Sequence, residues 1–332
     1  MLKNSKILVT GAAGLIGSAI IWALNRRGIS NIIATDFLGS DERWKNLRSL
    51  DFSDYLEADR LFDLLDTSRL GDIKYIFHLG ACSATTERDC RYLIENNFEY
   101  TRRLGEWALK KGCRFVYASS AATYGDGVNG MVDGEGHLGK YRPLNMYGYS
   151  KHLFDIHASR NGWLGEMVGI KYFNVFGPNE DHKGDMKSVV YKAYNQIKET
   201  GEARLFKSYR SDYRNGEQER DFVYVKDAVE MTLHLAEASS ACGIYNVGTG
   251  RASTWIDLVN PIFKTLGLTP NITFVDMPES LREKYQYYTC ADIDRLKKTG
   301  WRGESHNLDE AVSDYVGNYL IPGHHLGDAD TN

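Results

Sequence analysis

Tyr147 and Lys151 form a Tyr-x-x-x-Lys pair within the stretch MYGYSKHLF. Because they lie four residues apart on a predicted helix, an ammonium can stand beside a phenol on one face. A cation about 4 Å away, in an effective dielectric of about 20, contributes about 4 kcal/mol toward ionising that phenol. Ser120, in the stretch YASSAATYG, adds a hydroxyl that can orient a substrate oxygen. Together the three residues predict acid–base chemistry, although the pair alone is also typical of an ordinary amphipathic helix.

A glycine-rich turn near the N-terminus predicts a phosphate-binding site. Gly11, Gly14 and Gly17 follow the strand-like run 7–9 and precede a predicted helix. Without side chains in the way, backbone amides and a helix N-terminus can closely approach a pyrophosphate. A packing turn without a ligand would have the same spacing, so the residues that follow decide between the two interpretations.

Three further segments favour a nicotinamide dinucleotide. Asp36 ends the second predicted strand, where an acidic side chain accepts hydrogen bonds from the adenosine ribose. The segment 51–53 is expected at the adenine edge, and the small residues of 79–81 suit close passage of a cofactor. Asp36 alone favours NAD, whereas Arg43 could pair with the 2′-phosphate of NADP. A solvated arginine at position 43 fits the sequence equally well.

The elements that must position these residues follow a β-α-β-α rhythm. This rhythm predicts an α/β fold, a Rossmann-type doubly wound parallel sheet with a smaller C-terminal α/β substrate domain. We expect a dinucleotide-binding domain over 1–173, with segments near 221–248 packing back onto it, a substrate domain over 174–320, and a frayed tail over 321–332. The predicted strands are 6–9, 32–35, 75–78, 115–118, 168–172 and 244–247. The predicted helices are 15–27, 57–65, 90–111, 147–161, 227–236, 255–266 and 308–319, with Asp227 and Glu230 at capping-box spacing.

Composition excludes several classes of protein. The 332 residues are 42% hydrophobic and 25% charged, with a net charge of −4, which offers no basic footprint for nucleic acid. No apolar run approaches the roughly 20 residues that span a bilayer, and we expect no signal peptide before the first strand. The five cysteines lie far apart, which favours reduced thiols in the cytoplasm. Neither they nor the nine histidines show metal-ligand spacing, so no metal is expected.

The glycine turn, YASSAATYG and YGYSK, in this order, resemble the extended short-chain dehydrogenases that act on nucleotide sugars. More narrowly, the chain resembles the ADP-L-glycero-D-manno-heptose 6-epimerase family in six stretches: FHLGACSATTERD, ASSAATYG, PLNMYGYSK, KYFNVFGPNEDHKG, RDFVYVKD and YNVGTGRA. The resemblance implies epimerisation at C6 of an ADP-heptose, which supplies the heptose donor of the lipopolysaccharide core. It also implies a tightly held NADP, with NAD as the alternative, and a homo-oligomer, usually a pentamer.

The same resemblance assigns roles to individual residues. Tyr147 matches an acid–base tyrosine, Lys151 a cofactor-binding lysine and Lys183 a second acid–base group. The other implied cofactor positions are Leu15, Ile16, Asp36, Phe37, Arg43, Leu79, Gly80, Ala81, Cys82, Ser83, Asn96 and Val175. The implied substrate positions are Asn174, Lys183, Asp185, Lys192, Phe206, Lys207, Ser208, Tyr209, Arg220 and Tyr285. At three positions the chain differs from the pattern: Ala58 replaces a lysine, Asp185 a serine and Lys192 a histidine.

Lys183 and Arg220 each have a plainer interpretation. A lysine in a polar, glycine-containing loop is usually a solvated charge, but inverting a carbinol through a ketone needs a second proton-transfer group. Arg220 suits bidentate contacts to a diphosphate. It could equally be a structural arginine paired with the neighbouring Asp221.

Two other functions compete with the epimerase hypothesis. A UDP-hexose 4-epimerase shares the tyrosine–lysine chemistry but does not need Lys183. A dinucleotide-sensing scaffold would need no intact Ser120, Tyr147 and Lys151. A 4,6-dehydratase is excluded because 121–122, Ala-Ala, stands where an acidic pair would have to eliminate water.

Overall fold

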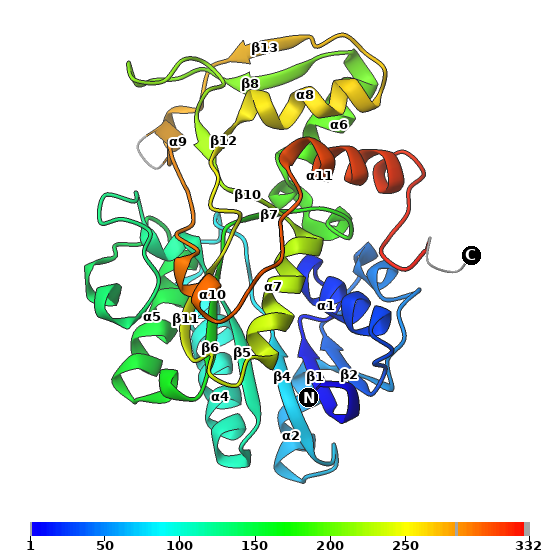
Figure 1. Ribbon diagram of the computed structural model, residues 1–332, viewed down its shortest axis with the longest axis vertical. Coiled ribbons are helices and arrows are strands. Elements are labelled where there is room, and N and C mark those ends of the chain that lie inside the picture. Colours follow the sequence, from blue (N-terminus) through cyan, green and yellow to red (C-terminus); the bar gives the residue numbers. More distant parts are fainter. Residues whose placement is uncertain (1, 283–284, 329–332) are drawn as a thin grey trace.

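A computed structural model describes residues 2–282 and 285–328 of the chain (Figure 1). Its centre is a seven-stranded parallel sheet with the strand order β11-β6-β5-β4-β1-β2-β3. The strands are β1 (Lys6–Thr10), β2 (Ile32–Asp36), β3 (Asp54–Glu57), β4 (Ile73–His78), β5 (Arg114–Ser120), β6 (Val168–Tyr172) and β11 (Gly243–Val247). The predicted Rossmann-type doubly wound sheet is therefore confirmed. Strand order reverses between β1 and β4, and ligands of such sheets bind at the carboxyl ends of the strands beside this point.

Helices cover both faces of the sheet and bury two separate apolar clusters. Side chains of α1 and α7 belong to one cluster, and side chains of α2, α4 and α5 belong to the other. The α-helices are α1 (Leu15–Arg26), α2 (Leu61–Asp66), α3 (Cys90–Leu93), α4 (Tyr100–Lys111), α5 (Met146–Arg160), α6 (Val189–Thr200), α7 (Val225–Glu237), α8 (Trp255–Thr265), α9 (Glu279–Arg282), α10 (Asp294–Lys298) and α11 (Leu308–Tyr315). Short 3₁₀ turns are η1 (Leu2–Asn4), η2 (Glu42–Asn46), η3 (Ala58–Arg60), η5 (Ala121–Tyr124), η6 (Glu135–Lys140), η7 (Trp163–Gly165) and η8 (Asp181–Met186), and π-helical turns are η4 (Ile94–Glu99) and η9 (Val316–Leu320).

Short sheets extend the molecule beyond the carboxyl ends of the large sheet. β13 (Ile272–Val275) pairs with β8 (Ala203–Phe206), β12 (Ser253–Thr254) with β9 (Glu219–Arg220), and β10 (Phe222–Tyr224) with β7 (Asn174–Phe176). In Figure 1 they lie above the large sheet together with α6, α8 and α11. The chain then returns, because α7 packs beside α1 and β11 pairs with β6.

The segment 51–53 corrects one expectation about the cofactor site. It lies at the amino end of the sheet, where Asp51 exchanges hydrogen bonds with Asn25 at the end of α1 and the Ser53 amide donates to Ile32 O at 2.9 Å. The expected adenine edge is therefore wrong for this segment. The strand β3, absent from the predicted pattern, carries the chain from here to Glu57 at the opposite edge.

Two details at helix and chain ends also differ from expectation. Helix α7 begins at Val225, so Asp227 lies inside its first turn and accepts hydrogen bonds from His306 instead of forming a capping box with Glu230. The predicted frayed tail is wrong for 321–328, where Leu326 is fully buried and its amide donates to Asn179 Oδ1 at 2.9 Å. The remaining tail residues, 329–332, lie outside the described part of the chain.

Candidate active site

The glycine turn forms a cradle that only small residues can line. Gly11 has a φ of +65°, a conformation that favours glycine, and a β-carbon there would lie 2.6 Å from the amide nitrogen of Gly80. A β-carbon on Gly17 would collide with the backbone of Gly11 itself. Gly14 is the N-cap of α1, followed by buried Leu15 and partly buried Ile16. The carboxyl ends of β1 and β4 thus meet where a pyrophosphate can approach bare backbone.

Asp36 lies beside this turn with its carboxylate fixed. It accepts hydrogen bonds from the Ala13 amide at 2.9 Å and the Phe37 amide at 2.8 Å. Burial raises its pKa, against these hydrogen bonds and the nearby Arg43. The Phe37 ring itself is exposed. An acidic group so placed at the end of β2 suits hydroxyls of a ribose.

Arg43 is not a free loop cation. Its guanidinium forms a two-pronged pair with Asp41, and Nη1 lies 3.7 Å from Asp36 Oδ1. Arg43 is therefore a partly exposed arginine held by carboxylates, because the η2 turn folds back onto the end of β2.

Tyr147 and Ser120 meet at the end of β5. Ser120 ends the strand and Tyr147 lies in the first turn of α5, whose N-cap Asn145 accepts from the Gly148 amide. The Ser120 hydroxyl, which accepts from the Ala122 amide at 3.1 Å, is close enough to the Tyr147 phenol to influence its pKa. Two hydroxyl groups at one sheet edge suit proton transfer to and from a substrate hydroxyl.

The electrostatics around Tyr147 differ from the sequence-based expectation. Burial raises the pKa of the phenol above its ordinary value, with the nearby Ser120 hydroxyl acting in the opposite direction. The Lys151 ammonium donates to the Ala118 carbonyl at 2.9 Å, and burial lowers its pKa to about 8. The expected lowering of the Tyr147 pKa by Lys151 is therefore wrong for the protein alone, since Lys151 is not among the groups that shift this pKa and desolvation dominates.

A buried ion pair missed by sequence reasoning supports this part of the site. Lys171 Nζ on β6 lies 3.1 Å from Asp155 Oδ2 on α5, and both side chains are fully buried. Asp155 also accepts from Tyr117 OH at 3.0 Å and Ser119 Oγ at 2.7 Å on β5. The pair therefore ties α5, which carries Tyr147, to the two strands beneath it. A lysine within the apolar strand 168–172 was the available signal.

Lys171→Met is expected to lower the free energy of unfolding by about 3–5 kcal/mol, because it leaves the Asp155 carboxylate buried without its cation. Urea denaturation followed by circular dichroism measures this loss. Adding Asp155→Leu to the same protein should recover part of it. A single variant as stable as the wild type would show that the pair contributes nothing.

Lys183 lies in η8, on the loop after β7. The side chain is half-buried, and burial lowers its pKa while nearby Glu180 acts to raise it. Its neighbour His182 lies 3.2 Å from Asn46 Nδ2, and Met186 receives a contact from Thr85 on the loop after β4. Lys183 is therefore less exposed than a fully solvated loop lysine, because its loop packs against the glycine turn through His182 and Asn46.

The other predicted cofactor positions lie around the ends of β4 and β7. The backbone amide of Leu79 donates to Thr10 O. Asn97 Oδ1 accepts from the backbone amide of Cys82 and from the side-chain Nδ2 of Asn96. Ser83 is exposed. On β7, Val175 is half-buried, and Asn174 has an exposed side chain while its amide donates to Asp221 O.

Arg220 lies beside Tyr285, another of the predicted substrate positions. Its guanidinium lies 5.1 Å from the ring centre of Tyr285 and 5.7 Å from that of Trp255, and donates to the carbonyls of Glu219 and Gln286. The alternative of an Arg220–Asp221 pair is wrong, because Asp221 accepts from Thr249, Gly250 and Ala291.

The remaining substrate positions fall into two groups. Phe206 stacks edge-on against Tyr285, while Lys207 and Tyr209 both contact Asp276, and Ser208 Oγ bonds to Arg210 O. Asp185 and Lys192 lie together on η8 and α6, where Lys192 Nζ donates to Asp185 O at 2.6 Å. This exposed pair forms the second group, which follows Lys183 along the chain.

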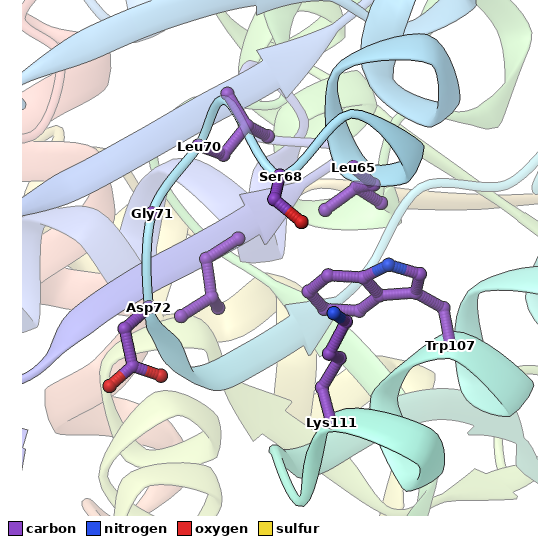
Figure 2. Close-up of a pocket in the computed structure, with 8 residues that line it drawn as sticks. Leu65, Ser68, Leu70, Gly71, Asp72, Trp107 and Lys111 are labelled. Atoms are coloured by element: carbon purple, nitrogen blue, oxygen red, sulfur yellow. The ribbon is translucent and has the colours of Figure 1, made fainter.

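A cavity of about 340 Å³ lies elsewhere, at the amino end of β4, lined by residues that include Leu65, Ser68, Leu70, Asp72, Trp107 and Lys111 (Figure 2). It is at the opposite end of the strand from His78 and therefore far from the candidate site. Within residues 2–282 and 285–328, no helix is long and apolar enough to cross a bilayer. The same residues contain no group of three or more histidine, cysteine, aspartate or glutamate side chains that could hold a metal ion.

Comparisons with known proteins agree with this geometry. The model of the NAD dependent epimerase/dehydratase family matches residues 7–248. ADP-L-glycero-D-manno-heptose-6-epimerases of Nitratidesulfovibrio vulgaris (strain DP4) and Fusobacterium nucleatum are 48% and 44% identical to this chain. The alignments cover 94% and 95% of this chain and 97% and 98% of theirs. The crystal structure of the enzyme of that name from Helicobacter pylori superimposes with a TM-score of 0.80 at 27% identity, covering 96% of each chain.

Proposed function

Since this chain belongs to the NAD dependent epimerase/dehydratase family, we propose that it inverts C6 of the heptose in ADP-glycero-D-manno-heptose. The observation that carries the proposal is the placement of Ser120 and Tyr147, at the end of β5 and the start of α5, at the same sheet edge as the glycine cradle. The 48% identity to a heptose epimerase over 94% of the chain supports the sugar. The product would serve as the heptose donor for the lipopolysaccharide core.

The cradle and Asp36 fit the pyrophosphate and ribose of a nicotinamide dinucleotide. When bound, this cofactor takes hydride from C6 and returns it, so the reaction needs no second redox partner. Lys151 is proposed to contact the nicotinamide ribose. Ser120 orients the substrate oxygen, and Tyr147 accepts or donates the hydroxyl proton of one epimer.

Lys183 is proposed to do the same for the other epimer. Hydride must leave one face of the carbinol and return to the opposite face. If the nicotinamide stays in place, the ketone must turn, and its oxygen then points to another part of the site. One phenol cannot serve both positions, and a half-buried lysine with a lowered pKa on the η8 loop is suited to the second.

NADP is the proposed cofactor, in preference to NAD. Arg43 supports it, because its guanidinium lies 3.7 Å from the Asp36 carboxylate and could contact a 2′-phosphate there. Arg43→Ala should therefore weaken the binding of NADP more than that of NAD, as measured by the amounts of each retained after purification from a mixture of the two.

Protein purified without added cofactor is expected to carry bound dinucleotide and to turn over without any supplement. An enzyme that oxidises and then reduces the same molecule gains nothing by releasing its cofactor. Absorbance of the purified protein and of its heat-released extract measures the content. Full dependence on added dinucleotide in every turnover would contradict this expectation.

The function is tested by offering ADP-heptose and UDP-galactose separately and recording NMR spectra of the products. We expect inversion at C6 of the heptose and none at C4 of galactose, whereas the reverse would identify a UDP-hexose 4-epimerase. No conversion of either compound would favour a dinucleotide-sensing scaffold.

Substrate deuterated at C6 should keep its label in ordinary water, because the hydride goes to the bound cofactor and returns. Product analysis by mass spectrometry measures the retained deuterium, and unreacted substrate from the same mixture serves as the reference. Washout of the label would show direct deprotonation and exclude the oxidation mechanism.

A cytoplasmic homo-oligomer is proposed on the same resemblance, with five subunits as its expected size. Light scattering during gel filtration measures the mass, and a monomer at micromolar concentration would contradict it. Neither a nucleic acid nor a membrane is needed for the proposed reaction.

A further inference from the structure

Two buried asparagines join the dinucleotide turn to the loop that carries Lys183. Asn46, at the end of η2, has only 2% of its surface exposed, and Asn179, just before η8, has 1%. Buried amides are costly unless they are hydrogen-bonded, so the partners of these two show what they hold in place.

Asn46 contacts both sides of the site with one nitrogen. Its Nδ2 lies 2.7 Å from Ala13 O in the dinucleotide turn, 3.0 Å from Asn179 O and 3.2 Å from His182 Nδ1. Both backbone polar groups of Ala13 are thereby hydrogen-bonded, since its carbonyl accepts from Asn46 and its amide donates to Asp36. His182 directly precedes Lys183, so a single side chain spans from the turn to the loop.

Asn179 makes the same connection from the other direction. Its Nδ2 donates to Ser18 Oγ at 2.9 Å, and Ser18 Oγ donates to Gly14 O at 2.7 Å. Its Oδ1 accepts from the amide of Leu326 at 2.9 Å. The residue has a φ of +75°, which asparagine tolerates better than other side chains do. The η8 loop therefore begins from a residue held by α1 and by the C-terminal segment.

We infer that Asn46 and Asn179 are positioning residues that hold the Lys183 loop against the dinucleotide turn. The inference rests on the proposed function, in which Lys183 transfers the proton of one epimer. The Tyr147–Ser120 pair stands on β5 and α5, which neither asparagine contacts through the hydrogen bonds described here. Loss of the asparagine contacts should therefore disturb one half of the reaction and spare the other.

Asn179→Gly is the variant of choice, because glycine accepts the positive φ while it removes the side chain that carries the amide. Each pure epimer is mixed in a stopped-flow instrument with holoenzyme, and reduction of the bound cofactor is followed in a single turnover. We expect the oxidation of one epimer to slow by about 10–100-fold, the range for a displaced catalytic group, with the other within about twofold of wild type. Asn46→Ala should show the same asymmetry, and it tests the inference even if Asn179→Gly does not fold.

Two controls separate positioning from general loss of stability. Asn318→Ala removes an exposed amide that donates to Asp314 in the same C-terminal region. Leu70→Ala weakens the core at the far end of the sheet, beside the cavity of Figure 2. Both should leave the ratio of the two oxidation rates unchanged. Equal slowing with both epimers in the asparagine variants, or no slowing, would overturn the inference, whereas failure of the wild type to reduce its cofactor with either epimer would overturn the proposed function instead.

Discussion

Lys183→Met is expected to abolish epimerisation while the fold and the bound cofactor remain intact. Methionine keeps the length of the side chain but carries no proton to transfer, so one epimer loses its acid–base partner. The expected loss is about 10²–10⁴-fold in turnover of ADP-heptose, the range for general acid–base catalysis. NMR of the product mixture measures the turnover, and the absorbance of the purified protein reports the cofactor.

Lys187→Met is the matched control for this experiment. Lys187 lies four residues away, and its ammonium sits over the ring of Tyr191 at 4.3 Å. The control variant should keep turnover within about twofold of wild type, as expected for a cation with no proposed part in the reaction. A fully active Lys183→Met would exclude the mechanism with two proton-transfer groups.

Tyr147→Phe is expected to reduce turnover by about 10²–10⁴-fold with little change in substrate affinity. The phenol lies near the Ser120 hydroxyl at the end of β5, and phenylalanine fills the same space without the hydroxyl. Steady-state kinetics separate the two quantities, since a lost proton-transfer group lowers kcat more than it alters KM. Near-normal turnover would remove Tyr147 from the mechanism.

Tyr149→Phe offers a matched control on the same helix, because Tyr149 lies two positions away with 46% of its surface exposed. It should behave as wild type. In single turnovers, Tyr147→Phe and Lys183→Met should each stop the oxidation of a different epimer. If both variants stop the same epimer, the division of labour between the two residues is wrong.

The regular part of the fold could be predicted because alternating strands and helices have local signals. Six strands of the large sheet and the helices from α1 to α5 follow apolar periodicity that is visible in the chain. The exception, β3, is short and half-exposed, so it lacks that apolar signal. Because β3 was not predicted, the segment 51–53 was expected at the wrong end of the sheet.

The chemistry of the site was predictable where short motifs contain it. Gly11, Asp36, Ser120 and Tyr147 lie at ends of predicted strands or on the helix after one, and parallel strands bring such ends to one edge. Their identities also indicated a dinucleotide and a hydroxyl as the reacting groups. Burial was not predictable in this way, and it raises the pKa of Tyr147 where spacing alone predicted a decrease.

The sequence by itself determined the alternation of strands and helices in the N-terminal half, the glycine turn and the tyrosine–lysine spacing, because each depends on neighbours a few residues apart. Only the tertiary structure decided how Asn46, Asn179 and Leu326 meet, and that Lys171 lies against Asp155. These contacts join segments up to 147 residues apart, and no local spacing encodes them. They form because a buried polar group must find a partner wherever folding brings one, which is a property of the packed molecule as a whole.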